Sequence, residues 1–85
     1  MVEVAERSLA FDRRHKAGLY ARAGIADYWI VNLIDEVVEV HRGPVTDAIA
    51  EFGWRYGNIQ TLATGGSISP LCRPDVTVAV ADLLP

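Results

Sequence analysis

Three ionisable residues near the start of the chain have the types and spacing for chemistry on a phosphate ester: Glu3, Asp12 and Lys16. Carboxylates are ligands that Mg²⁺ prefers, and a lysine ammonium can orient a water molecule or stabilise negative charge on a phosphate. A carboxylate on a central strand beside a lysine is what a metal-dependent phosphodiesterase needs. His15 lies between Asp12 and Lys16 but off their helix face, so we expect a surface histidine without a role.

Each candidate also has an ordinary structural explanation. Glu3 could face solvent on a frayed first strand, and Lys16 could form an ion pair with Asp12, one helical turn before it. Three aromatic residues are expected to pack in the core rather than to stack on bases: Tyr20, Trp29 and Trp54. They stand within apolar stretches and not among cations.

A helix beginning at Asp12 must position the lysine. Asp12 can act as N-cap by accepting hydrogen bonds from the first turn, and Gly24 can supply the left-handed residue that ends the helix. The inward side of the helical wheel carries Asp12, Lys16, Leu19, Tyr20 and Ala23. The opposite side carries residues that suit solvent: Arg14, Gly18 and Arg22. We therefore expect Lys16 to lie along the sheet towards Glu3.

The strands must position the carboxylate. Residues 1–5 predict a strand with Glu3 on one face and Val2 and Val4 on the other. Residues 28–33 are aromatic and β-branched without alternation, which indicates a strand covered on both faces. Residues 37–42 are predicted to form the second arm of a hairpin, nearer the sheet edge, which ends at 43–44. The remaining predictions, in chain order, are a loop at 45–53, a strand at 54–62, a Pro-rich loop at 67–74, a strand at 76–80 and the start of a helix at 82.

Composition limits the class of protein. Eighty-five residues make one small domain, and the charge sum of 8 cations and 11 anions, −3, argues against a surface that is wholly a nucleic-acid footprint. Five of the eight cations nevertheless fall in the first 22 residues, either as a solvated helix face or as a phosphate-facing edge. The single cysteine, Cys72, excludes an internal disulfide. No apolar run could span a membrane and the N-terminus lacks a secretory pattern, so we expect a cytoplasmic protein.

Several motifs together resemble the Uma2 family of restriction-endonuclease-like proteins. They are Val-Glu-Val at 2–4, Phe-Asp-Arg at 11–13 with Lys16, Leu-Tyr-Ala-Arg-Ala-Gly-Ile at 19–25 and Tyr-Trp-Ile-Val at 28–31. The hairpin ending at 38–42 and the segment from 68 to 84 are similar to the family's C-terminal half. The resemblance implies an α/β fold, in which a mixed β-sheet with a flanking helix forms the PD-(D/E)xK nuclease core.

The same resemblance implies a site. Glu3 matches the strand glutamate that binds metal, and Asp12 matches the acidic residue with which the following helix begins. Lys16 matches a lysine that in this family stands on that helix instead of on the strand. Ala5 stands where the usual motif would place the lysine. The implied activity is cleavage of DNA phosphodiester bonds with Mg²⁺, or Mn²⁺, as cofactor.

Two departures qualify the expected activity. The family's proline–aspartate pair lies just upstream of the strand glutamate, and this sequence begins before such a pair can occur. Asn32 stands where the family often has aspartate, at a position that we interpret as structural. We therefore expect residues 1–85 to be a partial domain, truncated at its N-terminus, that resembles an endonuclease but is inactive alone. The alternative is a non-catalytic remnant that serves as a dimerisation or protein-binding module, and in either case we expect a homo-oligomer, most simply a dimer.

Overall fold

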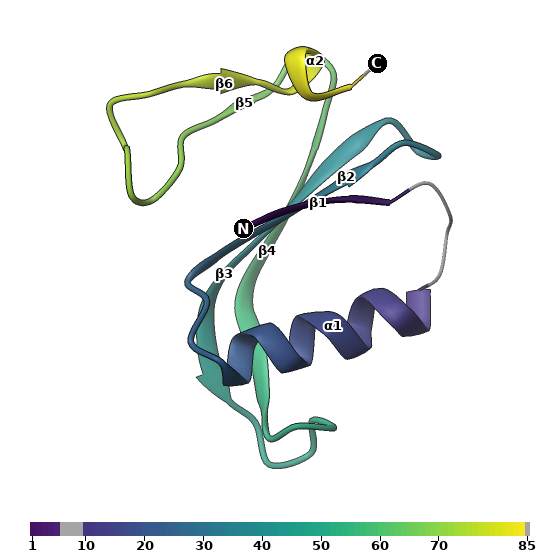
Figure 1. The fold of residues 1–85 in the computed structure, drawn as a ribbon, viewed down its shortest axis with the longest axis vertical. Coiled ribbons are helices and arrows are strands. Elements are labelled where there is room, and N and C mark those ends of the chain that lie inside the picture. The colour runs from purple at the N-terminus through teal and green to yellow at the C-terminus, as the bar shows by residue number, and fades with distance from the viewer. Residues whose placement is uncertain (6–9, 85) are drawn as a thin grey trace.

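A four-stranded sheet lies between one long helix and a small second layer of strands (Figure 1). The structure, a computed structural model, describes residues 1–5 and 10–84, without the side chains of residue 5 and of residues 10–14. Its elements are β1 (Val2–Ala5), α1 (Ala10–Arg22), β2 (Asp27–Asn32), β3 (Val37–Thr46), β4 (Trp54–Ala63), β5 (Ser67–Ile68), β6 (Val78–Ala79) and α2 (Val80–Leu83). The predicted α/β class with a mixed sheet and a flanking helix is confirmed.

The sheet has the strand order β1-β2-β3-β4. Strand β1 runs parallel to β2, with Glu3 opposite Ile30, and α1 makes the crossover that a parallel pair requires. Strands β2 and β3 form the predicted hairpin, and β4 pairs antiparallel with β3. Because β4 takes the far side, β3 is an inner strand along residues 37–42, and the prediction that this arm lies nearer the edge is wrong.

Each face of the sheet has its own apolar cluster, and β2 contributes to both. Trp29 and Val31 pack with buried residues of β3, β5 and α2 on one face. Tyr28 and Ile30 pack with Ala21 of α1 and with β4 on the other face. The absence of alternation in this strand therefore reflects cover on both sides, as predicted from the sequence.

The helix ends as predicted but begins earlier. Gly24 has φ of 80°, the N–H of Ile25 donates to the carbonyl of Tyr20, and the N–H of Gly24 donates to that of Ala21. These two bonds form a Schellman motif with glycine at the left-handed position. The predicted N-cap is wrong, because α1 begins at Ala10 and Asp12 is already in its first turn. An acidic residue is favoured there by the helix dipole.

The buried side of α1 also differs from the helical-wheel prediction. Ala21 is fully buried, whereas Ala23 lies beyond the helix end and is exposed. Part of the side assigned to solvent is covered by the β3–β4 connection: Phe52 packs against Gly18, and the guanidinium of the exposed Arg22 lies 5.2 Å from the centroid of the Phe52 ring. A wheel shows the apolar stripe of one helix, but not which loop will cover its other side.

Three further element boundaries differ from the predicted ones. Strand β3 continues through Pro44 to Thr46, because beyond Arg42 it pairs with β4 alone, and a proline is tolerated where one side of a strand is open. Strand β6 is only two residues long, and Val80 begins α2 rather than ending a strand.

Within the part of the chain that the structure describes, no helix is long and apolar enough to cross a bilayer.

Candidate functional site

Glu3 lies in the middle of β1 on the sheet face that α1 covers, and three side chains converge on its carboxylate. Tyr20 of α1 donates its hydroxyl to Oε1 at 2.5 Å, and Tyr28 of β2 donates to Oε2 at 3.0 Å. The Nζ of Lys16 lies 3.8 Å from the same Oε2. Parallel pairing of β1 with β2, and the helix that connects them, thus bring residues from three elements to one carboxylate.

Lys16 points towards Glu3 because it stands one helical turn before Tyr20, on the same side of α1. Its side chain is 44% exposed and that of Glu3 is 29% exposed, so the site lies at the surface end of the helix–sheet interface. An ion pair of this exposure adds little to stability. The alternative pair of Lys16 with Asp12 involves a side chain outside the described residues.

The hydroxyls of two buried tyrosines stay protonated at neutral pH. Burial raises the pKa of Tyr28 far above its ordinary value, and the hydrogen bond to Glu3 raises it further. Burial, together with the negative charge of Asp27, raises the pKa of Tyr56 to about 12. Tyr28 is therefore a hydrogen-bond donor to Glu3, and Tyr56 is a donor to the carbonyl of Ile25 at 2.7 Å.

An aromatic cluster of Tyr20, Tyr28, His41 and Tyr56 stands behind the carboxylate. Tyr28 contacts all three of the other rings, with centroid separations of 4.9 Å to Tyr20, 5.4 Å to His41 and 6.1 Å to Tyr56. The Nε2 of His41 also lies 3.5 Å from a carboxylate oxygen of Glu39. Packing on several sides fixes the Tyr28 ring, so the donor to Oε2 of Glu3 is rigidly placed.

The donor set around Glu3 does not by itself fit Mg²⁺. The ion requires near-octahedral oxygen ligands, usually with one or two carboxylates and several waters. Here each oxygen of a single carboxylate already accepts a phenol hydrogen bond, and the Lys16 ammonium is close to one of them. Among the described residues there is no group of three or more His, Cys, Asp or Glu that could hold a metal ion. The side chain of Asp12 lies outside those residues.

A family model described as "Putative restriction endonuclease" (Uma2) matches residues 1–81. The chain belongs to the Uma2 family. This confirms the assignment made from the sequence motifs, and the mixed sheet with its helix is consistent with a restriction-endonuclease-like fold. No curated protein sequence matches the chain. Glu3, Lys16 and their tyrosine neighbours all lie within the matched Uma2 residues.

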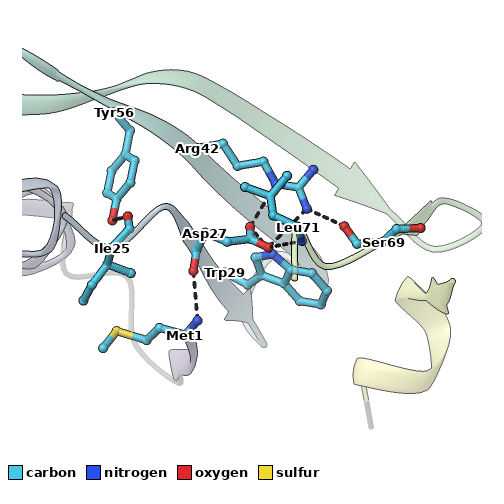
Figure 2. Close-up of polar contacts among 8 residues, drawn as sticks. All are labelled: Met1, Ile25, Asp27, Trp29, Arg42, Tyr56, Ser69 and Leu71. Carbon is cyan, nitrogen blue, oxygen red and sulfur yellow. Dashed lines mark hydrogen bonds and ion pairs between the residues drawn. The ribbon is translucent and has the colours of Figure 1, made fainter. Parts of the chain in front are cut away.

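This Uma2 chain has a second polar cluster, centred on Asp27 (Figure 2). Its Oδ1 accepts from the Trp29 indole at 2.7 Å and from Arg42 Nε at 2.9 Å, and its Oδ2 accepts from the backbone N–H of Leu71 at 3.0 Å. Arg42 also donates to the carbonyl of Ser69 at 2.5 Å. The cluster therefore joins the β2–β3 hairpin to the chain segment that follows β5.

Charge and hydrogen bonding oppose burial at Asp27. Burial alone would raise the pKa of this carboxyl, but hydrogen bonds from Arg42, Leu71 N–H and Trp29 outweigh it and hold the pKa below 3.8. The carboxylate is thus charged over the whole neutral range. Its donors come from the protein on both oxygens, which is the arrangement of a structural ion pair.

The sequence interpretation missed the tyrosines of the site and the Asp27 cluster. Its apolar neighbours predict core packing alone for Tyr20, although it stands four residues after Lys16 on the same side of the helix. The register of the hairpin, with Asn32 opposite Val37, places Asp27 opposite Arg42, a favourable cross-strand charge pair that the predicted strand bounds of 28–33 and 37–42 do not give. No local signal indicates that Leu71, 44 residues after Asp27, completes that cluster.

Proposed function

We propose that this Uma2 chain carries one metal-binding carboxylate, Glu3, and the lysine of a Mg²⁺-dependent endonuclease site, with DNA as substrate, and that it does not cleave DNA alone. The observation that supports the proposal is the approach of Lys16 Nζ to within 3.8 Å of Glu3 Oε2. Family membership supplies the reaction class, hydrolysis of phosphodiester bonds. Mg²⁺, or Mn²⁺ in its place, is the cofactor that we propose for the complete site. The proposed location of the protein is the cytosol.

Lys16 is the residue proposed to contact the phosphate. Its ammonium is a compact charge on a flexible stem, and with the side chain 44% exposed a phosphate oxygen can reach it. Glu3, held by two phenols, keeps that ammonium at the mouth of the helix–sheet interface. Asp12, in the first turn of α1 and one turn before Lys16, is the third proposed site residue.

The expected lack of cleavage follows from the number of carboxylates. Mg²⁺ gives up its water molecules reluctantly and is held firmly only when charged oxygens are arranged around it. Glu3 supplies one carboxylate, and its oxygens already receive donors from Tyr20, Tyr28 and Lys16. An ammonium cannot replace a divalent ion in polarising a phosphate.

Plasmid nicking tests the proposal. We expect no nicking by the 85-residue chain with Mg²⁺ or Mn²⁺ beyond an EDTA control. Extending the chain with a Uma2 segment that carries the proline–aspartate pair should produce metal-dependent nicking, and Glu3→Ala and Lys16→Ala should each remove most of it. Arg55→Ala is the matched control, because this exposed cation pairs with Asp47 away from Glu3. Robust nicking by the 85-residue chain that survives Glu3→Ala would show that the site is elsewhere.

A second function, as a dimerisation or protein-binding module, is favoured by the outer edge of β1. This strand ends the sheet order among the described residues, and its Val2 and Val4 are 54% and 62% exposed. An open apolar edge can pair with a strand from another chain. A binding module would keep its association when Glu3 and Lys16 are replaced, whereas the extended nuclease would lose its nicking activity.

A further inference from the structure

Strand β4 lies at the edge of the sheet opposite β1, and its middle is covered by neither layer. It is ten residues long and, among the described residues of this sheet, pairs with β3 alone. Residues 57–61 are exposed one after another, so both faces of the strand are accessible there. Its packed residues lie nearer the two ends, where Tyr56 joins the cluster under α1 and Leu62 packs on the opposite cluster. The middle of β4 is therefore open on its outer edge and on both faces.

This stretch lacks the features that commonly keep an edge strand from pairing with another chain. Natural edge strands are protected by charged side chains, by proline or by being very short. Residues 56–63 contain no charged residue and no proline. The nearest cation, Arg55, pairs with Asp47 at 3.0 Å. Strand β1, in contrast, is four residues long and carries Glu3. Of the two edges, β4 is the longer and less protected template for an added strand.

The same stretch is complementary to itself in an antiparallel register centred on Ile59. In this register Ile59 lies opposite Ile59 of a second copy, and Asn58 lies opposite Gln60. Side-chain amides can both donate and accept, so these opposed amides can form hydrogen bonds. Gly57 lies opposite Thr61, and no charge meets a like charge. Ile59 is 57% exposed, and pairing about a two-fold axis would remove its side chain from water.

We infer that β4 is an interaction surface for a second copy of this chain: two β4 strands pair antiparallel about Ile59 and join the two sheets into one. This interface goes beyond the proposed nuclease site and beyond the edge of β1, because it uses no residue of either. Since β1 and β4 stand at opposite ends of the strand order, each edge can be blocked separately. Val4→Lys, on β1, should leave the pairing through β4 intact.

Disulfide crosslinking tests the register. Each variant is made in the full chain with Cys72→Ser, because the native thiol is exposed and would react. Ile59→Cys places two thiols directly opposite each other, with Cβ atoms about 4.5–5.5 Å apart. Thr61→Cys is the matched control on the same exposed strand, but its two thiols would be about 14 Å apart. In a glutathione buffer Ile59→Cys should form a covalent dimer about tenfold faster than Thr61→Cys, because only the closer sulfurs are within bonding reach.

Sedimentation gives a second measurement that needs no cysteine. In the Val4→Lys background, where the edge of β1 is blocked, we expect dimers that Ile59→Lys converts to monomers and Ile49→Lys does not. Ile49 is a suitable control because it is 94% exposed in the β3–β4 connection. Equal crosslinking rates for Ile59→Cys and Thr61→Cys, or a Val4→Lys chain that is monomeric at all concentrations, would overturn the inference. Thermal melting of each variant verifies that the compared chains are folded.

Discussion

Arg42 donates to both carboxylate oxygens of Asp27 across the β2–β3 pair, at 2.9 and 3.3 Å. The same guanidinium donates to the carbonyl of Ser69, and the same carboxylate accepts from the N–H of Leu71. Two residues that are neighbours across a hairpin therefore also hold a segment that is distant in sequence. That segment connects β5 to β6 and leads into α2, the elements that cover one face of the sheet (Figure 1).

Replacing Asp27 by asparagine should lower the free energy of unfolding by about 2 kcal/mol, since charge-assisted hydrogen bonds to a largely buried carboxylate are lost. Urea denaturation measures the change. Asp75→Asn is the matched control, because Asp75 also accepts two contacts from an arginine, Arg73, but its side chain is 69% exposed. No measurable change is expected for the control. Equal losses in the two variants would contradict the role of Asp27.

The stabilisation by Asp27 should depend on pH in one direction. Its pKa in the folded chain lies below the ordinary 3.8. The charged form therefore stabilises the fold at every pH above about 4, the unfolded-state pKa, and this contribution is lost as the pH falls through the lower folded-state value. The difference in urea midpoint between the unsubstituted chain and Asp27→Asn should be constant from neutral pH to about pH 5 and shrink below it. A difference that grows on acidification would refute this assignment.

We expect glycine to be required at position 18 because of the neighbouring Phe52 and not because of the helix conformation. A Cβ at this position would lie 2.9 Å from Cδ2 of Phe52, so Gly18→Ala should reduce the free energy of unfolding by about 1 kcal/mol. In a Phe52→Ala background the same change should instead stabilise by up to about 1 kcal/mol, because alanine is the better helix former. Urea denaturation of the four chains gives the coupling. If Gly18→Ala changes the free energy of unfolding in the same direction in both backgrounds, the contact between residue 18 and Phe52 does not determine its effect.

The outer edge of β1 should lead to self-association. Sedimentation at several concentrations is expected to show association that Val4→Lys reduces, because a lysine on an edge strand opposes pairing with another strand. Ile49→Lys is the control, since Ile49 is 94% exposed in the β3–β4 connection and away from this edge. A monomer with a sharp melting transition at all concentrations would count against an exposed edge that recruits partners.

Strand β2 is covered on both faces, as predicted for residues 28–33, and it has no open edge. Strand β2 is paired on both sides, by β1 and by β3, and all but one of its residues are buried. Among the described residues, the strands at the two edges of this sheet are β1 and β4. Periodicity shows that a strand is buried, but the order of strands in a sheet depends on pairings between residues far apart in the chain.

The sequence by itself determined the local elements and the family. Apolar runs, turn glycines and the Uma2 motifs predicted the strands, the helix end at Gly24 and the nearness of Lys16 to Glu3, because each depends on residues within a few turns or on a short crossover. Tertiary structure alone decided what surrounds the carboxylate. The phenols of Tyr20 and Tyr28 meet Glu3 across 17 and 25 residues, and Leu71 meets Asp27 across 44. Such contacts form only when the sheet register and the packing of its two faces are fixed, and no local pattern records them.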